Sequence, residues 1–427
     1  MKKSLFFCLL IWVNVTAFSQ EIVKVMHYNL LQYGAPLCPD GVTTPVVLSQ
    51  KNTWLKTIML AYQPDIFTVN EMRKDIGYAN NIRVNVLSFY NSAMSITTFG
   101  NSSGSDIVNT LFYNSNKFGY LKHYAITGNV RDIDVYKLYH KNSTVAGDST
   151  FLWGFVAHLK AGSASTDVSQ RTAAAQDVMT WLNAHPEVDN YFISGDFNLY
   201  TSSEGAYQAF LNPNDTRRFY DVTGQTTGWS GSNYKNYHTQ SPRVSANNCG
   251  TTGGMDNRFD FILVNNAILN NANGVKYVAN SYKAYGNDGV SYDVALNCAA
   301  TTSVSATVCT ALQEMSDHLP VVMELEFPTI VGTEQALQKT MGVEMQVLGN
   351  PVEEELALNF SYFSTKSTTY QLSITNTLGQ VFHTQTLIAM ENGQRLNFSW
   401  QTYPSGLYFI HLTDEKGNHL TKKVLKR

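Results

Sequence analysis

The chain is short of charged residues. Only 15% of its 427 residues are Asp, Glu, Lys or Arg, and the formal net charge is -3. A surface with so little positive charge has no strong basic field to hold a polyanion, which disfavours a static nucleic-acid-binding protein. An enzyme that acts on nucleic acid would have to rely on local contacts and a metal ion.

Long apolar segments are also missing, apart from one near the N-terminus. Leu5 to Val15 is shorter than a membrane span, follows the basic pair Lys2-Lys3, and precedes the small-residue stretch Ala17-Phe18-Ser19. This order is typical of a signal peptide with its cleavage site. We therefore predict a signal peptide over residues 1–19, a mature chain that begins at Gln20, and no stable membrane insertion.

Cysteine is scarce, and no two cysteines have C-x-x-C spacing, which argues against a four-cysteine metal site. Once Cys8 leaves with the predicted signal peptide, Cys38, Cys249, Cys298 and Cys309 remain. An even number of cysteines in an exported chain predicts disulfides. Cys298 and Cys309 could close a short loop, and Cys38 would then pair with Cys249. Spacing alone does not choose among the three connectivities.

The segment from residue 22 to residue 327 alternates short apolar strands with loops and a few helices. Trp54, Leu55, Ile58 and Tyr62 recur at helical spacing before Pro64, and the residues that follow read as a buried strand. Alternating order of this kind predicts an α/β domain over residues 20–328, with two packed sheets flanked by helices.

The composition changes after residue 328. Residues 329–344 are polar and lack clear periodicity, which predicts a linker. In residues 345–427, apolar positions such as Leu356, Leu358 and Phe360 alternate with polar ones, and glycine-containing turns separate the runs. This pattern predicts a small all-β domain, and that segment contains no cluster of catalytic residue types.

Several predicted strands of the larger domain deliver polar residues at or just beyond an end. These residues are Asn29, Glu71, His158, Asp196, Asn198, Asp260, Asp317 and His318. Phosphodiester hydrolysis needs charge neutralisation, an oriented water and help for the leaving oxygen. Carboxylates and amides suit Mg²⁺, and histidines move protons near neutral pH. Each residue also has a structural alternative, such as a turn, a helix cap or a core histidine. Spacing alone does not show that they converge.

The order of these motifs resembles the endonuclease/exonuclease/phosphatase superfamily, with its deoxyribonuclease-I-like fold. The resemblance covers about residues 22–327. It rests on Tyr28-Asn29-Leu30, Pro64-Asp65-Ile66 leading to Glu71, His158-Leu159-Lys160, Gly195-Asp196-Phe197-Asn198, the segment 258–263, and Ser316-Asp317-His318-Leu319-Pro320. It implies a four-layer α-β-β-α sandwich and metal-dependent cleavage of phosphodiesters.

The resemblance also implies a role for each residue. Glu71 would be the main ligand of Mg²⁺, with Mn²⁺ or Ca²⁺ as alternatives, and Asn29 and Asp317 would lie close to the metal. Asp196 would activate the attacking water, and Asn198 would hold the phosphate or that water. His318, oriented by Asp260, would contact the scissile phosphate. His158 would stabilise transition-state charge or assist the leaving oxygen.

Three further residues are candidates for substrate binding. Tyr113 lies on a predicted strand where superfamily members often place a tyrosine facing the cleft. The stretches 237–243 and 253–258 resemble secreted bacterial members, which makes His238 and Arg243 candidates, since the Arg243 fork could grip a phosphate. A long ordered surface loop is the structural alternative for this region. For Arg171, at the start of a predicted helix, we expect a surface or packing role.

The C-terminal segment resembles the type A sorting domain of the type IX secretion system. The matching residues are Gly349-Asn350-Pro351, Asn376-Thr377-Leu378-Gly379-Gln380, Pro404-Ser405-Gly406-Leu407-Tyr408 and the basic end 422–427. The resemblance implies passage through the periplasm, the type IX machinery as a partner, and an extracellular or cell-surface location. A carbohydrate- or protein-binding β-sandwich is the alternative.

Taken together, these patterns predict a secreted, monomeric, metal-dependent endonuclease that cleaves DNA or RNA. The first alternative is the same chemistry on another phosphoester, as in a sphingomyelinase or phospholipase C. Such enzymes usually carry an apolar hairpin for membrane contact, and the sequence shows no clear candidate. The second alternative is an inactive surface binding protein, which would be expected to lack catalytic positions that are filled here.

Overall fold

The computed structural model describes residues 18–35, 47–128, 130–145, 148–224, 228–243, 250–330, 338, 341–362, 369–390 and 393–427. Contacts divide the chain into two compact units, one of residues 20–329 and one that contains residues 330–427. Most of the predicted signal peptide, most of the predicted linker, and Cys38 and Cys249 lie outside the described residues.

The larger unit contains two mixed sheets. The first has the order β11 (Lys276–Tyr277), β13 (Val321–Ile330), β1 (Phe18–Tyr33), β2 (Ile66–Arg73), β4 (Ile107–Asn114) and β3 (Met94–Ile96), with β12 (Lys283–Ala284) also paired to β13. The second has the order β5 (Phe118–Ile126), β6 (Ile133–Val145), β7 (Asp148–His158), β8 (Tyr191–Asp196), β10 (Asp260–Asn265) and β9 (Phe219–Tyr220). Strands β1 and β2 are parallel, as are β7 and β8, whereas β2–β4 and β8–β10 are antiparallel.

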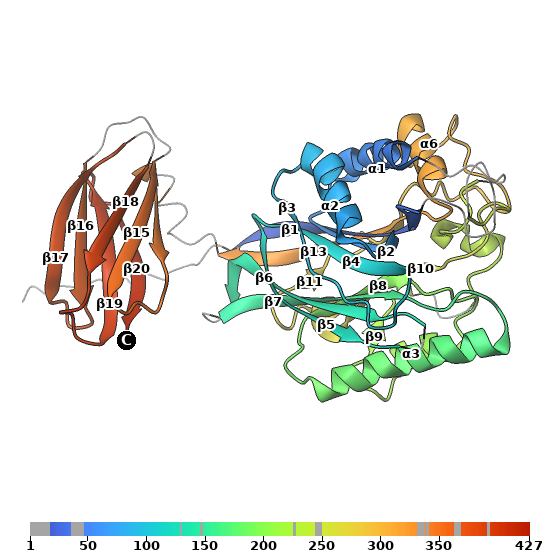
Figure 1. Cartoon of the computed structure of the whole chain (residues 1–427), viewed down its shortest axis with the longest axis horizontal. Helices are drawn as coiled ribbons and strands as arrows, with labels where there is room; N and C mark the ends of the chain where they lie inside the picture. Colours follow the sequence, from blue (N-terminus) through green and yellow to red (C-terminus); the bar gives the residue numbers. More distant parts are fainter. Residues whose placement is uncertain are drawn as a thin grey trace, which may run out of the picture. The chain divides into compact units, whose positions relative to one another are not determined.

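Helices cover the outer face of each sheet (Figure 1). Helices α1 (Leu48–Tyr62), α2 (Ile76–Asn85) and α6 (Ala306–Met315) pack on the first sheet, and α3 (Ser165–Ala184) and α4 (Gly205–Phe210) pack on the second. The short elements η1 (Leu87–Phe89), η2 (Ser232–Tyr237) and α5 (Asn266–Asn270) lie in connections. A third apolar cluster holds the two sheets together. The predicted four-layer α-β-β-α sandwich is confirmed.

Side-chain alternation determines where polar groups collect between the sheets. Every second side chain of a strand points to the same face of the sheet. Along β1, Val23 and Val25 belong to the inter-sheet cluster, and His27 and Asn29 follow them on that face. Along β8, Phe192 is followed on the same face by Ser194 and Asp196. The inter-sheet layer therefore changes from apolar to polar towards the C-terminal ends of these strands.

Strands β10 and β4 run antiparallel to β8 and β2, so their first residues lie at the end of the layer where β8 and β2 finish. These first residues are also polar. Strand β10 starts with Asp260, which pairs with Asp196, and continues into the apolar inter-sheet residues Ile262 and Val264. Strand β4 likewise places Asn109 before Leu111. One end of the inter-sheet layer is consequently lined by polar side chains from several strands.

The smaller unit contains two antiparallel sheets with a core of their own. One consists of β14 (Val343–Leu348), β15 (Glu355–Tyr362) and β18 (Gln394–Ser399), and the other of β17 (Val381–Ile388), β16 (Thr369–Asn376), β19 (Gly406–Asp414) and β20 (His419–Lys426). Trp400 and other alternating apolar residues are buried between them. The predicted all-β sandwich is confirmed.

Two local features can be read from the structure. Cys298 and Cys309 form a disulfide, one of the pairings that the sequence left open. Helix α3 begins at Ser165, and the Asp167 carboxylate accepts the N–H of Ala164. Within the described residues, no helix is long and apolar enough to cross a membrane.

Candidate active site

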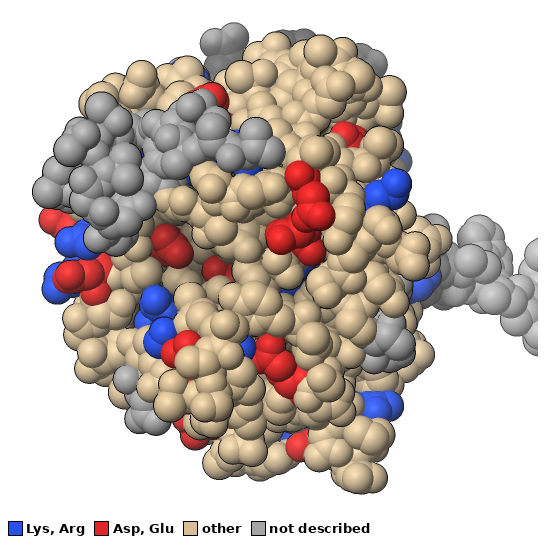
Figure 2. Space-filling view, turned by 90° about the vertical axis from the view of Figure 1, so that its right-hand side faces the viewer, with Lys and Arg blue, Asp and Glu red and all other residues tan. Residues whose placement is uncertain are grey.

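The eight polar residues predicted from the strand ends meet at one end of the inter-sheet layer. Their side chains or backbones are linked through Asn29–Glu71, Asn29–Asp196, Glu71–His158, His158–Asp196, Asp196–Asn198, Asp196–His318, His318–Asp260 and His318–Asp317 contacts. Figure 2 shows a hollow in one face of the molecule with acidic side chains inside it and basic side chains on its rim. The convergence on which the sequence prediction depended is therefore present.

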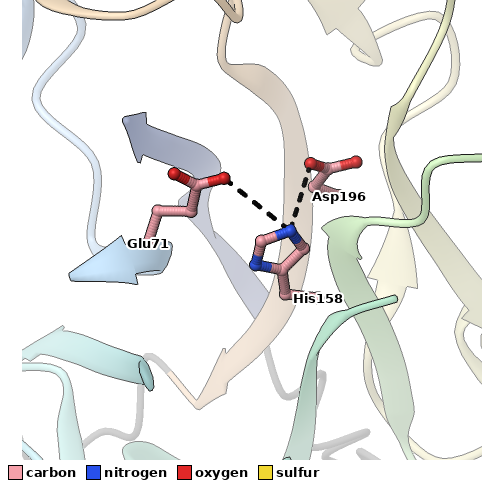
Figure 3. Close-up of side chains that lie close together, drawn as sticks. All are labelled: Glu71, His158 and Asp196. Carbon is pink, nitrogen blue, oxygen red and sulfur yellow. Dashed lines mark ion pairs between the residues drawn. The ribbon is translucent and has the colours of Figure 1, made fainter. Parts of the chain in front are cut away.

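Glu71, His158 and Asp196 form the centre of this group (Figure 3). His158 Nε2 lies 3.7 Å from Glu71 Oε1 and 3.6 Å from Asp196 Oδ2. Glu71 is the most accessible of the three, with 16% of its side chain exposed, compared with 3% for each partner. Glu71 is therefore the member of this group that is most open to solvent.

The backbone around Glu71 is bent out of regular strand geometry. Glu71 has a φ of 55°, and the pairing of β2 with both of its neighbours shifts register here. Leu31 and Gln32 of β1 also have positive φ, and the Gln32 N–H donates to Glu71 Oε2 over 3.1 Å. Non-glycine residues in this conformation are costly and cluster at functional sites. Here the bend carries the Glu71 carboxylate to the polar end of the layer.

His318 and Asp260 form a close pair behind the centre. His318 Nδ1 lies 2.7 Å from Asp260 Oδ2, and its Nε2 points towards Asp196 Oδ2 at 3.8 Å. The hydroxyl of Thr239 accepts the backbone N–H of Asp260, which fixes the start of β10. Burial alone would lower the pKa of His318, but the neighbouring carboxylates outweigh it and hold that pKa well above its ordinary value.

Four carboxylates, those of Glu71, Asp196, Asp260 and Asp317, gather at the site. Burial raises the pKa of Asp196 to about 7, and burial together with Asp317 raises the pKa of Glu71. The pKa of His158 lies well below its ordinary value, mainly because of burial, so this ring is neutral and adds no positive charge. A site rich in carboxylate oxygens fits a hard divalent cation.

Asn29 links the carboxylates of Glu71 and Asp196. Its Nδ2 donates to Glu71 Oε1 at 3.1 Å and to Asp196 Oδ2 at 3.0 Å, while its Oδ1 accepts the N–H of Leu31. The amide therefore presents its hydrogens to the centre of the site and orients the two carboxylates. Its place close to the metal stays a prediction.

Asp317 and Asn198 are held by backbone contacts at the edge of the group. Asp317 accepts the N–H of Thr251 through Oδ2, at 2.6 Å. Asn198, with a φ of 51°, donates its backbone N–H to Asp196 Oδ1 and its side-chain amide to the carbonyl of Leu159. Both residues thus stabilise the loops that surround the central carboxylates.

Arg131 also lies at the site, although it was not among the predicted residues. Its guanidinium donates to the carbonyl oxygens of His158 and Leu159, and its charge acts on Glu71 and Asp196. Arg131 comes just before β6, in a turn with no motif that marks it as functional. Only the pairing of β6 with β7 brings it beside His158.

Two asparagines between the sheets were also missed. Asn70 Oδ1 accepts the N–H of Asp196 at 2.8 Å, and its Nδ2 donates to Asn109 Oδ1 at 2.7 Å. Asn109 in turn donates to Asp134 Oδ2, which lies beside His123. This chain of hydrogen bonds fixes the backbone of Asp196 from inside the sandwich.

Of the surface and packing roles that we expected for Arg171, the structure shows the packing role. Arg171 is fully buried, and it donates to Glu204 Oε2 through Nε and Nη2 and to the carbonyls of Lys160 and Gly162 through Nη1. Glu204 also accepts the N–H of Tyr200. Arg171 and Glu204 therefore tie the loop after His158 to the loop after Asp196.

The three predicted substrate-binding residues have different surroundings. Tyr113 pairs with Ile66 at the start of β2, about 16 Å from Glu71 at roughly 3.3 Å per residue, because β4 runs antiparallel to β2. His238 is fully buried, and its Nε2 lies 2.7 Å from the carbonyl of Trp229. Arg243 is buried and donates to the carbonyl of Gln313, and its charge acts on Lys51 together with that of Asp317. Substrate binding by these residues stays a prediction.

The C-terminal segment matches a known protein family. Residues 346–427 match the family described as "Secretion system C-terminal sorting domain". The smaller unit is a secretion-system sorting domain. No curated protein matches the sequence of the chain. The sorting domain indicates secretion, with an extracellular or outer-surface location.

Beyond the sorting domain, the fold is similar to several solved structures. One is D. rerio TDP2 with a single-strand DNA product, at 16% identity and a TM-score of 0.44, covering 71% of this chain and 98% of that one. Another is the human Nocturnin catalytic domain with sulfate, at 15% identity and a TM-score of 0.41, covering 73% and 97%. A third is described as an endonuclease/exonuclease/phosphatase from Beutenbergia cavernae, at 13% identity and a TM-score of 0.38, covering 95% and 99%.

Proposed function

We propose that the protein is a secreted, Mg²⁺-dependent phosphodiesterase, specifically an endonuclease that hydrolyses DNA or RNA. The observation that carries this proposal is the meeting of Glu71, His158 and Asp196 with the His318–Asp260 pair at one end of the sandwich. The resemblance of the surrounding motifs to the endonuclease/exonuclease/phosphatase superfamily supports the reaction class. The sorting domain supports export.

The residues of the site suit in-line attack of water on a phosphodiester. Asp196 accepts the proton of the attacking water, since a carboxylate whose pKa lies near 7 is an effective base at neutral pH. Asn29 and the N–H of Asn198 hold that carboxylate in place. The new bond joins the water oxygen to phosphorus as the bond from phosphorus to the leaving oxygen breaks.

The two histidines act on the charge that develops during this step. His318, kept protonated by the surrounding carboxylates and oriented by Asp260, stabilises the non-bridging oxygens of the phosphate. Neutral His158 lies between Glu71 and Asp196, where it stabilises transition-state charge or assists the leaving oxygen. Arg131 adds a fixed positive charge beside them.

Mg²⁺ fits the oxygen donors of this site. Glu71 would be its main ligand and Asp317 would support it, while the nitrogen of His158 is a poorer donor for a hard cation. The bound ion would supply charge neutralisation at the phosphoryl oxygens. Mn²⁺ and Ca²⁺ share this preference for oxygen and are the alternatives.

A panel of substrates tests the proposal. Plasmid DNA, RNA, sphingomyelin and bis-p-nitrophenyl phosphate are each incubated with the purified full chain, with and without EDTA. We expect cleavage of DNA or RNA that EDTA abolishes. Asp196→Ala and His318→Ala should each lower kcat by at least about 100-fold, since removing one catalytic group often has an effect of this size.

Each contrary result has a distinct meaning. Activity that persists in EDTA, or that persists in both variants, contradicts the metal-assisted mechanism for every substrate. Cleavage of sphingomyelin with nucleic acid left intact replaces the nuclease by the phospholipase-like alternative. No cleavage of any substrate supports the binding-protein alternative.

A further inference from the structure

A second histidine lies on the far side of Asp260 from His318. His27, on β1, is fully buried between the sheets, two residues before Asn29. Its Nε2 faces Asp260 Oδ1 at 3.9 Å, while Asp260 Oδ2 is occupied by His318 Nδ1 at 2.7 Å. The two carboxylate oxygens of Asp260 are thus directed at two different imidazole rings.

The facing atoms of His27 and Asp260 have no hydrogen-bond partner among the described residues. Both His27 Nε2 and Asp260 Oδ1 are buried, and neither makes a hydrogen bond there. A separation of 3.9 Å is longer than a hydrogen bond, but buried polar atoms are rarely left unpaired. A shift of less than 1 Å would bring them within about 3 Å of each other.

The other ring nitrogen of His27 is already engaged. His27 Nδ1 lies 3.0 Å from Thr68 Oγ1, and Thr68 Oγ1 lies 2.8 Å from Ser194 Oγ. If the ring carried its proton on Nδ1, the bare Nε2 would face the Asp260 carboxylate, and two acceptors would repel each other. If the proton is on Nε2, Thr68 donates to Nδ1 and Ser194 donates to Thr68, so each hydroxyl has a role.

We infer that His27 is a positioning residue that donates from Nε2 to Asp260 and so holds the carboxylate that orients His318. The resulting chain runs from Ser194 through Thr68, His27 and Asp260 to His318. It crosses from the second sheet to the first and back, using residues of β8, β2, β1 and β10. The inference rests on the proposed function in taking Asp260 and His318 as part of the catalytic machinery.

The chain offers a matched control. His140, on β6, is also a buried histidine, but it packs against Phe118 and Phe327, and its Nε2 lies 3.2 Å from Glu21 Oε2. It therefore lies near the start of β1, at the apolar end of the layer. Substitution of His140 reports the cost of removing a buried imidazole away from the site.

The first measurement is the tautomer of His27 in the full chain. Histidine labelled with ¹⁵N distinguishes a protonated Nε2 from a protonated Nδ1, and the His27→Gln variant assigns the signal by its loss. We expect His27 to carry its proton on Nε2. A proton on Nδ1 overturns the inference whether or not the protein is a nuclease, so this result is independent of the proposed function.

The second measurement is the kinetics of matched variants with the nucleic acid that the wild type cleaves. His27→Leu should lower kcat by about 10- to 100-fold with little change in KM, as is usual when the partner of an orienting group is lost. His140→Leu should stay close to the wild type. His27→Gln keeps an N–H near the position of Nε2 and should retain most of the activity.

Thermal unfolding of each variant accompanies the kinetics. Activity of His27→Leu equal to that of the wild type overturns the inference. So does His27→Gln with the same loss as His27→Leu while still folded, because a donor to Asp260 would then not be what His27 supplies. If His27→Leu does not fold, the kcat of His27→Gln is compared with that of the wild type. Retention of most of the activity supports the inference, and a loss of about 10-fold or more in the folded variant overturns it.

Discussion

At the scale of single residues, Glu71 combines unusual backbone geometry with a perturbed carboxylate. Its positive φ places the side chain at the end of the inter-sheet layer, and burial raises its pKa. We propose that the Glu71 carboxylate is the main ligand of Mg²⁺, so Glu71→Gln, which removes its negative charge, should bind Mg²⁺ much more weakly. Calorimetric titration of Mg²⁺ into the variant and the wild type measures this directly.

The control for this titration is Asp65→Asn, which alters a carboxylate that pairs with Lys117 at the opposite end of the sheets instead of joining the central cluster. We expect its Mg²⁺ affinity to stay within about threefold of that of the wild type, since no proposed metal ligand changes. Equal affinities for Glu71→Gln and the wild type would remove Glu71 as the principal ligand.

At the residue scale, the sequence located polar residues that stand at the boundary of a predicted strand. Asp196, Asp260 and His318 could be placed because each stands at a strand boundary within a short motif. The orientation of Asn29 could not be predicted, since which end of an amide faces a carboxylate depends on neighbours that are distant in sequence. The contact of His238 with the carbonyl of Trp229, nine residues earlier, was also not predicted, because only the folded loop brings the two groups together.

At the scale of elements, Arg171 connects α3 to the loop after His158 and to the loop after Asp196. A guanidinium can donate to Glu204 and to two carbonyls at once, whereas an ammonium cannot reproduce this planar fork. We predict that Arg171→Lys and Arg171→Met both lower kcat by about tenfold or more, because the loop that follows His158 and the loop that carries Asn198 lose their common support. Steady-state kinetics with thermal unfolding measure both effects.

Lys117 supplies the comparison for Arg171. It bridges Asp65 and Glu21 at the opposite end of the sheets, so Lys117→Met removes an ion-pair network without touching the loops. We expect a loss of stability with kcat unchanged. Arg171→Lys with wild-type kcat would show that the clamp contributes to stability alone.

Element positions were easier to predict from the sequence than element directions. Buried strands were recognised near β2, β7, β8 and β10 from their apolar runs, and the helical period identified α1. Tyr113 was misplaced because the direction of β4 relative to β2 is not written in its own residues. In the antiparallel arrangement the start of β4, with Asn109, reaches the site, and its end does not.

At the scale of the whole molecule, buried titratable groups make the stability of the fold depend on pH. Burial lowers the pKa of His27 to about 4, and the pKa values of His158 and His238 are lowered as well. The unfolded chain binds more protons at these histidines, so their contribution to the free energy of unfolding should decrease as pH falls from 6.5 to 4, whereas Asp196 and Glu71, whose pKa values are raised, contribute with the opposite sign. For His27 alone this amounts to roughly 3 kcal/mol.

His318 contributes with the opposite sign. Its raised pKa favours the folded state below the unfolded pKa, and this stabilisation is lost as pH rises through the folded value. Urea denaturation in EDTA at several pH values tests the acid effect, with His27→Gln as the variant that cannot titrate there. Identical pH dependence in variant and wild type would contradict the assignment to His27.

The two units have separate apolar cores, since the clusters of residues 23–327 and those of residues 341–424 share no members. We therefore predict that a chain ending at residue 329 keeps full phosphodiesterase activity in vitro but is not exported by cells that secrete the full-length chain. Activity assays and immunoblots of medium and periplasm measure the two properties. A truncated chain that is inactive yet folded would show that the sorting domain takes part in catalysis.

The sequence by itself determined the two-part organisation, the four-layer and all-β fold classes, and the residue types gathered at the site. It could do so because apolar periodicity and short motifs are local properties of the chain. Only the tertiary structure decided which polar atoms face one another, and it alone revealed Arg131, Asn70 and the ring of His27 behind Asp260. Those contacts join strands far apart in sequence, and their geometry depends on register and strand direction, which local patterns do not encode.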